Sequence, residues 1–382
     1  MNNQSTTHPS RLKPNYTMKI VSRIARFLVG IVFIFSGLIK LNDPVGTQIK
    51  LEEYFEVFAH DMAFLHGFFH AIVPFALYFA VFLCVAEVVL GVALLVRYRP
   101  RTTNFLLLLI IIFFSFLTFY SAYFNKVTDC GCFGDALKLT PWTSFTKDLI
   151  LLVLIVIIIW YQRDIKPLPT AMVVAVATVG SLVLAFYAIT HLPPLDLLPY
   201  RVGNSIPEQM KPSEPYQFEY IFLKDGKTHR FKEFPDDSTY VYQDMVTLNA
   251  DKAKPKVTDY RVWNDTTDYT QESFKGNKLI VIVKNLKDIN AAAFPTIKKL
   301  VDELAGSDIQ PLIFTSAASN EIEDFLHAQQ LSVPYYFADA TVLKTISRSN
   351  PGIWLLSDGV VKGKWHYNDT PAAATVRKLV KP

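Results

Sequence analysis

The chain has 382 residues, enough for two domains, and 51% of them are hydrophobic while only 19% are charged. The apolar residues are concentrated in long runs in the first half, which excludes one large soluble core and indicates a membrane protein. The net charge is only +4, and the basic residues lie at the ends of hydrophobic runs, which argues against a nucleic-acid partner. Three cysteines exclude a dense disulfide scaffold.

The N-terminal arm, residues 1–19, is polar and is predicted to be disordered. It leads into a first apolar run, Ile24–Leu41. A cleaved signal peptide would place a small-x-small site after such a run. Here the run is followed by Asn42-Asp43-Pro44, so we expect an uncleaved first span.

Four further apolar runs follow, and each has close to the ~20 residues that cross a hydrocarbon core. The fourth span opens with Thr140-Pro141, a capping residue followed by proline at the first helical position. Lys147 and Asp148, near its start, are expected at the membrane interface. The predicted spans after the first are 71–96, 104–124, 143–162 and 170–191.

The basic residues predict the orientation of these spans. They gather in the arm and in the loops after the second and fourth spans, whereas loops 42–70 and 125–142 are acidic and poor in basic residues. Positively charged loops stay in the cytoplasm, so the N-terminus is expected there. Five spans then place the C-terminal region outside.

The loop between the third and fourth spans carries the sequence Cys130-Gly131-Cys132. Its expected extracytoplasmic side is where disulfides persist. Two cysteines one residue apart can be bridged, and Gly131 permits the tight bend that this requires. Because strained, exposed disulfides are oxidising, the pair could act as a thiol–disulfide relay. A static clip that shapes the loop is an equally good interpretation.

A metal site is a third interpretation of the same loop. His66 and His70 lie four residues apart, on one face of any helix that contains them, and on the same side as the cysteines. Two thiolates and two imidazoles would suit zinc or copper.

Glu87 lies inside the second span, where an ionisable group is costly and is a functional candidate by default. The alternative is a protonated carboxyl bonded to a neighbouring helix. Lys40 either extends to the outer interface or pairs with Glu87. Gly91, one turn further on, would permit close helix approach, and Cys84 is predicted to be a small buried apolar residue.

The region after about residue 208 has the pattern of a soluble α/β layer. Asp358-Gly359 is a hairpin turn signal between its last two strands. The stretch 216–263 is predicted to be β-rich, with Asp225-Gly226 as another turn. The expected elements are strand Lys278–Lys284, helix Phe294–Leu304, strand Pro311–Thr315, helix Glu321–Gln330, strand Tyr335–Ala338 and hairpin strands Ile353–Ser357 and Val360–Trp365.

Three motifs in the membrane region resemble a known family. The pattern Arg26-x3-Gly30-x5-Ser36-Gly37-x2-Lys40-Leu41-x-Asp43-Pro44 resembles the first span of DoxX proteins, and Glu87-x3-Gly91-x3-Leu95 resembles their second span. The Asp129-Cys-Gly-Cys-Phe-Gly134 loop is similar to the MauE (methylamine utilisation) branch. Over residues 18–160, the resemblance implies a four-helix membrane bundle. It also implies disulfide handling of periplasmic proteins, or membrane-linked sulfur and quinone redox chemistry.

Residues 275–382 are similar to a thioredoxin-like domain. Pro351, before the last hairpin, matches the position of that fold's cis proline. The loop Asn285–Ala293 lacks the expected Cys-x-x-Cys. This absence removes thiol chemistry from the domain and leaves a binding or scaffolding role.

Together these observations predict a four-helix DoxX/MauE-like bundle with a fifth transmembrane helix, followed by a soluble α/β thioredoxin-like domain. The protein is expected in a bacterial inner membrane, with a periplasmic C-terminal domain. The expected boundaries are 1–19 for the arm, 20–162 for the bundle, 163–192 for the fifth helix, 193–274 for the linker and β-rich segment, and 275–382 for the thioredoxin-like domain.

The predicted function is thiol–disulfide exchange between Cys130/Cys132 and a periplasmic protein, with Glu87 as an intramembrane catalytic carboxyl. An enzyme of this kind would be an oxidoreductase acting on thiols, in the maturation of periplasmic proteins as in methylamine utilisation. No cofactor is firmly implied, and a quinone is the candidate. The alternatives are an assembly factor whose disulfide is structural, with Gly131 and Gly134 shaping its loop, and a metal-handling protein that uses His66 and His70.

Overall fold

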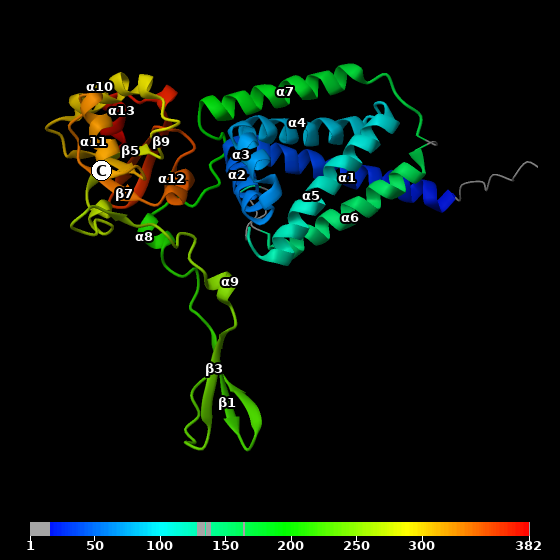
Figure 1. Ribbon diagram of the computed structural model, residues 1–382, viewed down its shortest axis with the longest axis horizontal. Coiled ribbons are helices and arrows are strands. Elements are labelled where there is room, and N and C mark those ends of the chain that lie inside the picture. The colour runs from blue at the N-terminus through cyan, green and yellow to red at the C-terminus, as the bar shows by residue number, and fades with distance from the viewer. Residues whose placement is uncertain (1–15, 128–133, 135–138, 163–164, 382) are drawn as a thin grey trace, which may run out of the picture. The chain divides into compact units, whose positions relative to one another are not determined.

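The computed structural model describes residues 16–127, 134, 139–162 and 165–381 (Figure 1). Cys130, Gly131 and Cys132 therefore lie outside the described residues, whereas Gly134 lies among them. The chain forms two compact units. The first reaches Ile189 and includes 193–195, and the second contains 190–192 and the chain from Asp196 onward.

The first unit contains five helices that are long and apolar enough to cross a membrane, which confirms the five predicted spans. The second span begins earlier than predicted, at Ala63, because the short helix α3 (His66–Ile72) and two 3-10 turns continue directly into α4. The long helices are α1 (Tyr16–Asn42), α4 (Ala76–Leu95), α5 (Pro100–Phe124), α6 (Pro141–Trp160) and α7 (Ala171–Thr190).

Helix α2 (Pro44–Asp61) occupies part of the segment that the sequence analysis treated as a loop, and that interpretation is wrong. The helix starts with the signal that also opens α6: Asp43 caps it by accepting a hydrogen bond from Gly46 N at 2.8 Å, and proline follows. Its buried residues include Leu51, Tyr54 and Phe58, which lie on one face. The acidic residues on its other sides disguise this pattern.

Small residues let α1 and α4 approach each other closely. A Cβ atom added at Gly91 would lie 2.8 Å from Gly30 O, and one added at Gly37 would lie 2.9 Å from Val88 N. Side chains at these positions would therefore collide with backbone atoms. The predicted close approach at Gly91 is confirmed, and the contact follows the small-residue pattern of membrane helix pairs.

The bundle core is formed by α1, α4, α5 and α6, which pack side by side (Figure 1). Helix α7 joins through Ala185, which shares a buried cluster with Leu41, Cys84 and Val88. The outward sides of these helices carry large exposed hydrophobic residues, such as Phe82 and Val183, as expected for surfaces that face lipid. The core residues are Ala25, Val29, Phe33, Leu90, Leu94, Leu107, Ile111, Leu151, Ile155 and Ile158.

The second unit is built on a six-stranded sheet of order β4-β7-β6-β5-β8-β9. Strands β5, β6 and β7 are parallel, and β8 and β9 form an antiparallel hairpin beside β5. The predicted strands and hairpin are confirmed to within two residues at each end. The strands are β4 (Val262–Trp263), β5 (Asn277–Val283), β6 (Ile309–Thr315), β7 (Tyr335–Ala338), β8 (Gly352–Ser357) and β9 (Val360–His366).

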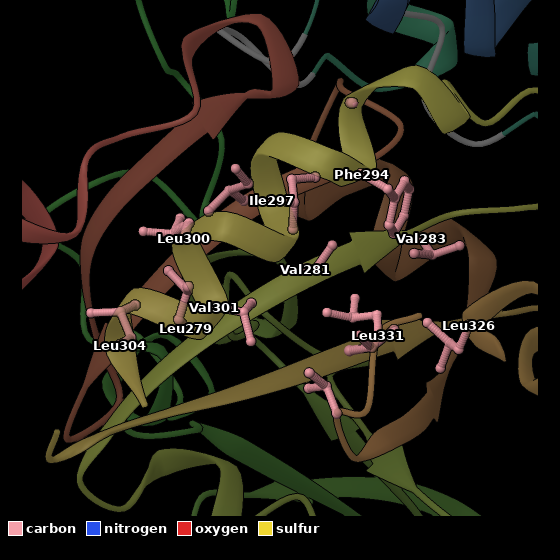
Figure 2. Close-up of a cluster of buried hydrophobic side chains, with 14 of the residues drawn as sticks. Leu279, Val281, Val283, Phe294, Ile297, Leu300, Val301, Leu304, Leu326 and Leu331 are labelled. Carbon is pink, nitrogen blue, oxygen red and sulfur yellow. The ribbon is translucent and has the colours of Figure 1, made fainter. Parts of the chain in front are cut away.

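Helices cover both faces of this sheet. On one face α10 (Phe294–Leu304) packs on β5, where Leu279, Val281 and Val283 point toward Phe294 and Ile297 (Figure 2). This face also receives α11 (Ser319–Ala328) and α13 (Ala373–Val380). On the other face, Ile280 and Ile282 pack with α12 (Ala340–Ile346). Because β5 is buried on both faces, its sequence is continuously apolar.

The order of these elements is that of a thioredoxin-like fold. A parallel β5–α10–β6 unit is followed by the β8–β9 hairpin and a closing helix, α13. The Asn350–Pro351 peptide bond, which precedes β8, is cis. Strand β7 and helix α12 are inserted between α11 and the hairpin.

A separate three-stranded antiparallel sheet of order β2-β1-β3 precedes this domain. Its strands are β1 (Phe218–Lys224), β2 (Lys227–Phe231) and β3 (Val241–Thr247), with the predicted Asp225-Gly226 turn between the first two. Both turn residues have positive φ, as the tightest hairpins require. Phe222 is buried among aromatic side chains that include Phe231 and Phe234.

Candidate functional site

Lys40 of α1 and Glu87 of α4 form a buried ion pair inside the membrane bundle. The Lys40 Nζ atom lies 2.5 Å from Glu87 Oε1, and the two residues are 5% and 2% exposed. The Lys40 ammonium also lies 4.2 Å from the centre of the Phe114 ring, a cation–π contact. Of the two alternatives for Lys40, the structure has the pair with Glu87. The close approach of the helices at Gly37 brings the two residues together.

A second pair of opposite charges comes from α6. Asp148 is 1% exposed, accepts a hydrogen bond from Thr118 Oγ1 at 3.0 Å, and lies 2.7 Å from Lys147 Nζ. The sequence predicts both residues at the membrane interface but does not indicate that Asp148 faces into the bundle. Lys147 remains 23% exposed and links the buried carboxylate to the bundle surface.

The two pairs line one small cavity between α1, α4, α5 and α6. Its volume is about 20 Å³, which holds one water molecule but is far below the several hundred Å³ of a ligand pocket. Glu87 Oε2 is buried and has no hydrogen-bond partner among the described residues. The cavity is lined by Val32, Phe33, Ser36, Lys40, Glu87, Ile111, Phe114, Lys147, Asp148 and Leu151.

The chain that enters the cysteine segment is fixed to the bundle by a cluster around Asp61. This carboxylate, at the end of α2, accepts hydrogen bonds from Tyr120 and Lys126 and lies 3.0 Å from His60 Nδ1. These bonds, that of Lys126 above all, hold the pKa of Asp61 well below its usual range. Val127 is fully buried, and its carbonyl accepts from Ser121 Oγ.

Gly134, just beyond the cysteine pair, lies against the end of α1. A Cβ atom added to it would lie 3.5 Å from Ile39 Cγ2, an ordinary van der Waals contact. Its φ of 52° is in the left-handed region that favours glycine. Ile39 adjoins Lys40, so the described residues that flank the cysteine segment, Val127 and Gly134, are both packed on the bundle.

The predicted metal ligands His66 and His70 lie together on α3, with ring centres 4.5 Å apart. Within the described ranges, no group of three or more His, Cys, Asp or Glu side chains could hold a metal ion. The two cysteines of the predicted metal site lie outside these ranges. Cys84 is buried, as predicted, with its sulfur 3.9 Å from Thr47 Oγ1.

In the thioredoxin-like domain, Asn350 forms hydrogen bonds with the loop after β5, where the sequence resemblance predicts a Cys-x-x-Cys. Its side chain accepts from Lys284 N and donates to Asn285 O, both at 3.0 Å, and its carbonyl accepts from Asn290 N at 3.0 Å. These three bonds tie the cysteine-free loop after β5 to the cis-proline segment. Asn350 therefore joins these two segments by hydrogen bonds, and the junction contains no thiol.

The geometry of the bundle can be compared with known proteins. Residues 18–161 match the family model of methylamine utilisation protein MauE. The MauE-like region contains all four charged residues of the cavity and both cysteines of the loop. No curated protein matches the chain. Among solved structures, StoA from Bacillus subtilis is similar at 12% identity and a TM-score of 0.23, covering 28% of this chain and 83% of that one.

Proposed function

We propose that this protein is a bacterial inner-membrane factor that exchanges disulfides with a periplasmic protein through Cys130 and Cys132. In this proposal the N-terminus is cytoplasmic, and the cysteine loop and the thioredoxin-like domain are periplasmic. The exchange serves the maturation of a periplasmic partner, in a process such as the methylamine utilisation after which the MauE family is named.

The observation that carries the proposal is the MauE match, which spans nearly all of the four core helices of the bundle and includes the cysteine pair. The two described neighbours of the pair add support. Val127 is anchored by Ser121, and Gly134 lies near Ile39, so the described residues on both sides of the pair lie near one end of the bundle. The loops at the opposite end carry Arg97, Arg99 and Arg101, which favours an extracytoplasmic location for the cysteines.

The thioredoxin-like domain contributes docking rather than thiol chemistry in this proposal. It has no cysteine, and Asn350 occupies the junction between its redox-loop position and the cis-proline segment. Electron exchange is therefore confined to the membrane unit, where all three cysteines of the chain lie.

A quinone does not fit the cavity beside Glu87, because about 20 Å³ holds a water molecule and not an aromatic ring. The proposed exchange therefore involves no quinone in this cavity. The exchange itself needs none: the Cys130 thiolate attacks a disulfide of the partner, a mixed disulfide forms, and the released partner thiolate takes up a proton. The Cys132 thiolate then attacks the Cys130 sulfur of the mixed disulfide, which forms a Cys130–Cys132 disulfide and releases the second partner thiolate. The partner disulfide is thereby reduced and the cysteine pair oxidised, and a periplasmic dithiol reductant returns the pair to its thiol form by the same exchange.

Trapping tests this proposal. In full-length protein carrying Cys132→Ser, Cys130 should accumulate as a mixed disulfide with a periplasmic protein, detected as an adduct that reductant removes. Cys84→Ser is the matched control, since Cys84 is buried in the bundle and should form no adduct. The proposal fails if Cys132→Ser gives no adduct and the double variant Cys130→Ser/Cys132→Ser matures partners normally.

The same variants test the alternative of a structural clip in an assembly factor. A clip would make the thermal stability of the bundle, rather than the redox state of a partner, respond to loss of the cysteines. Metal analysis of purified protein, with and without His66→Ala and His70→Ala, tests the metal-handling alternative.

A further inference from the structure

We propose that Glu87 and Asp148 form a proton-binding site within the membrane bundle, organised around one water molecule and reached through Lys147. No sequence motif indicated this arrangement, because the two carboxylates come from α4 and α6 and are 61 positions apart (148 − 87). The ligand is a proton delivered by water.

The cavity has the volume and the chemistry of a water site. A water needs roughly 10–15 Å³ and two to four polar partners, and this cavity offers about 20 Å³. Glu87 Oε2 supplies a buried acceptor that no described residue satisfies. Asp148, Lys40 and Lys147 line the same space.

Charged side chains line the cavity from two helices that neighbour α4. Lys40 faces Glu87 from α1, and Lys147 and Asp148 line the cavity from α6. Among the described residues, helix α5 contributes only Ile111 and Phe114 to the cavity walls, and Cys84 lies one turn away on α4 itself. The carboxylates of Glu87 and Asp148 are therefore the ionisable proton acceptors that line this space.

The exposed fractions of the side chains indicate the route by which a proton enters the cavity. Asp148 and Glu87 are almost completely buried, whereas Lys147 is 23% exposed and contacts Asp148 at 2.7 Å. A proton from a hydronium ion reaches the cavity water past Lys147 and forms an O–H bond at Glu87 Oε2. Lys40 stays bonded to Oε1, and no electron is transferred.

The site would also serve the proposed disulfide exchange, and this role alone rests on the proposed function. Each exchange step releases a thiolate that must take up a proton. Lys40 of the proton site adjoins Ile39, whose Cγ2 would lie 3.5 Å from a Cβ atom added at Gly134, beside the cysteine segment. The proton held on Glu87 supplies this thiolate.

Infrared spectroscopy tests the proton site directly. Full-length Cys130→Ser/Cys132→Ser protein in lipid nanodiscs is titrated with acid, so that the result cannot depend on thiol exchange. Because the chain contains 34 Asp and Glu residues, Glu87 is isolated by subtracting the spectrum of the Glu87→Gln variant. We expect this difference spectrum to show a carboxylic-acid C=O band that appears on acidification and shifts in D₂O. Glu87→Asp should restore the band at a shifted frequency, and Asp148→Asn should move its titration midpoint.

Glu53→Gln provides the matched control, because Glu53 is a partly exposed glutamate of α2 paired with Lys50. It should leave the shifted band unchanged. A Glu87→Gln difference spectrum that contains no D₂O-sensitive acid band across the titration, with the variant correctly folded, would overturn the proposal. If trapping fails while this band is found, the proton site stands and the thiol function falls.

Discussion

The ammonium of Lys40 lies 2.5 Å from a carboxylate oxygen of Glu87, although the two residues are 47 positions apart and both are buried. Removing one partner leaves an uncompensated charge inside the bundle, so Lys40→Met should destabilise the protein by roughly 3–5 kcal/mol. Adding Glu87→Gln should recover part of that loss. Unfolding in detergent followed by circular dichroism measures both effects.

Lys50 and Glu53 on α2 provide the control for this cycle, since both are partly exposed. Lys50→Met should cost only about 0.3–0.5 kcal/mol, as for other helix-surface pairs. Strictly additive effects of Lys40→Met and Glu87→Gln would show that the two side chains do not interact.

Gly91 of α4 lies close to the backbone of α1. A methyl group there would lie 2.8 Å from Gly30 O and 3.0 Å from Ile34 N, so Gly91→Ala should push the helices apart. We expect a loss of about 1–3 kcal/mol, the usual range for overpacking. Gly180→Ala on α7, where nothing lies within 4 Å, should be neutral or slightly stabilising. Equal stabilities of the two variants would contradict the packing described for α1 and α4.

The membrane helices could be predicted from sequence because each apolar run is long enough to span a bilayer by itself. Helix α2 could not be predicted by that criterion, since its three glutamates conceal a buried face of Leu51, Tyr54 and Phe58. Its Asp43-Pro44 start was nevertheless visible and is the same signal as Thr140-Pro141. A capping residue followed by proline therefore indicates a helix start at both segments.

The sequence indicates Glu87 and Lys40 of the candidate site but not Asp148. Glu87 is a charge in the middle of an apolar run, and pairing with Glu87 is one of the two alternatives that the sequence leaves for Lys40. Asp148 lies in the eighth position of α6, where a charge is compatible with the interface, and only the bundle geometry turns it toward Thr118. Contacts between distant segments depend on helix rotation, which the apolar pattern of a lipid-exposed helix does not determine.

His366 should make the soluble domain sensitive to acid. Burial lowers its pKa to about 4; the nearby charge of Asp369 opposes this, whereas those of His191 and Lys284 add to it. The unfolded chain therefore binds a proton that the folded domain excludes. The contribution of His366 to the free energy of unfolding should therefore be fully present above pH 6.5. It should decrease between pH 6.5 and 4, by up to about 1.4 kcal/mol per pH unit.

Thermal unfolding as a function of pH checks this expectation. His366→Gln keeps an acceptor for Asn368 N, which donates to His366 Nδ1 at 3.2 Å, and should flatten the pH dependence. His327→Gln on the exposed side of α11 should leave it unchanged. A wild-type profile that is flat over this interval would mean that His366 is protonated in the folded domain.

Asp61 holds the chain that enters the cysteine segment, because it accepts hydrogen bonds from Tyr120 and Lys126. Asp61→Ala removes both bonds, so the reduced cysteines should react several-fold faster with a maleimide, measured by mass shift over time. Since these bonds hold the pKa of Asp61 below its ordinary value, acid should loosen the wild-type segment only as the carboxylate protonates.

Glu56→Ala is the matched variant for this experiment, because Glu56 is an exposed acid of the same helix. Its labelling rate should equal that of the wild type, and the rate with Asp61→Asn should lie between those of Asp61→Ala and wild type, since an amide oxygen still accepts one bond. If Asp61→Ala and Glu56→Ala label at the same rate, the Asp61 cluster does not control access to Cys130 and Cys132.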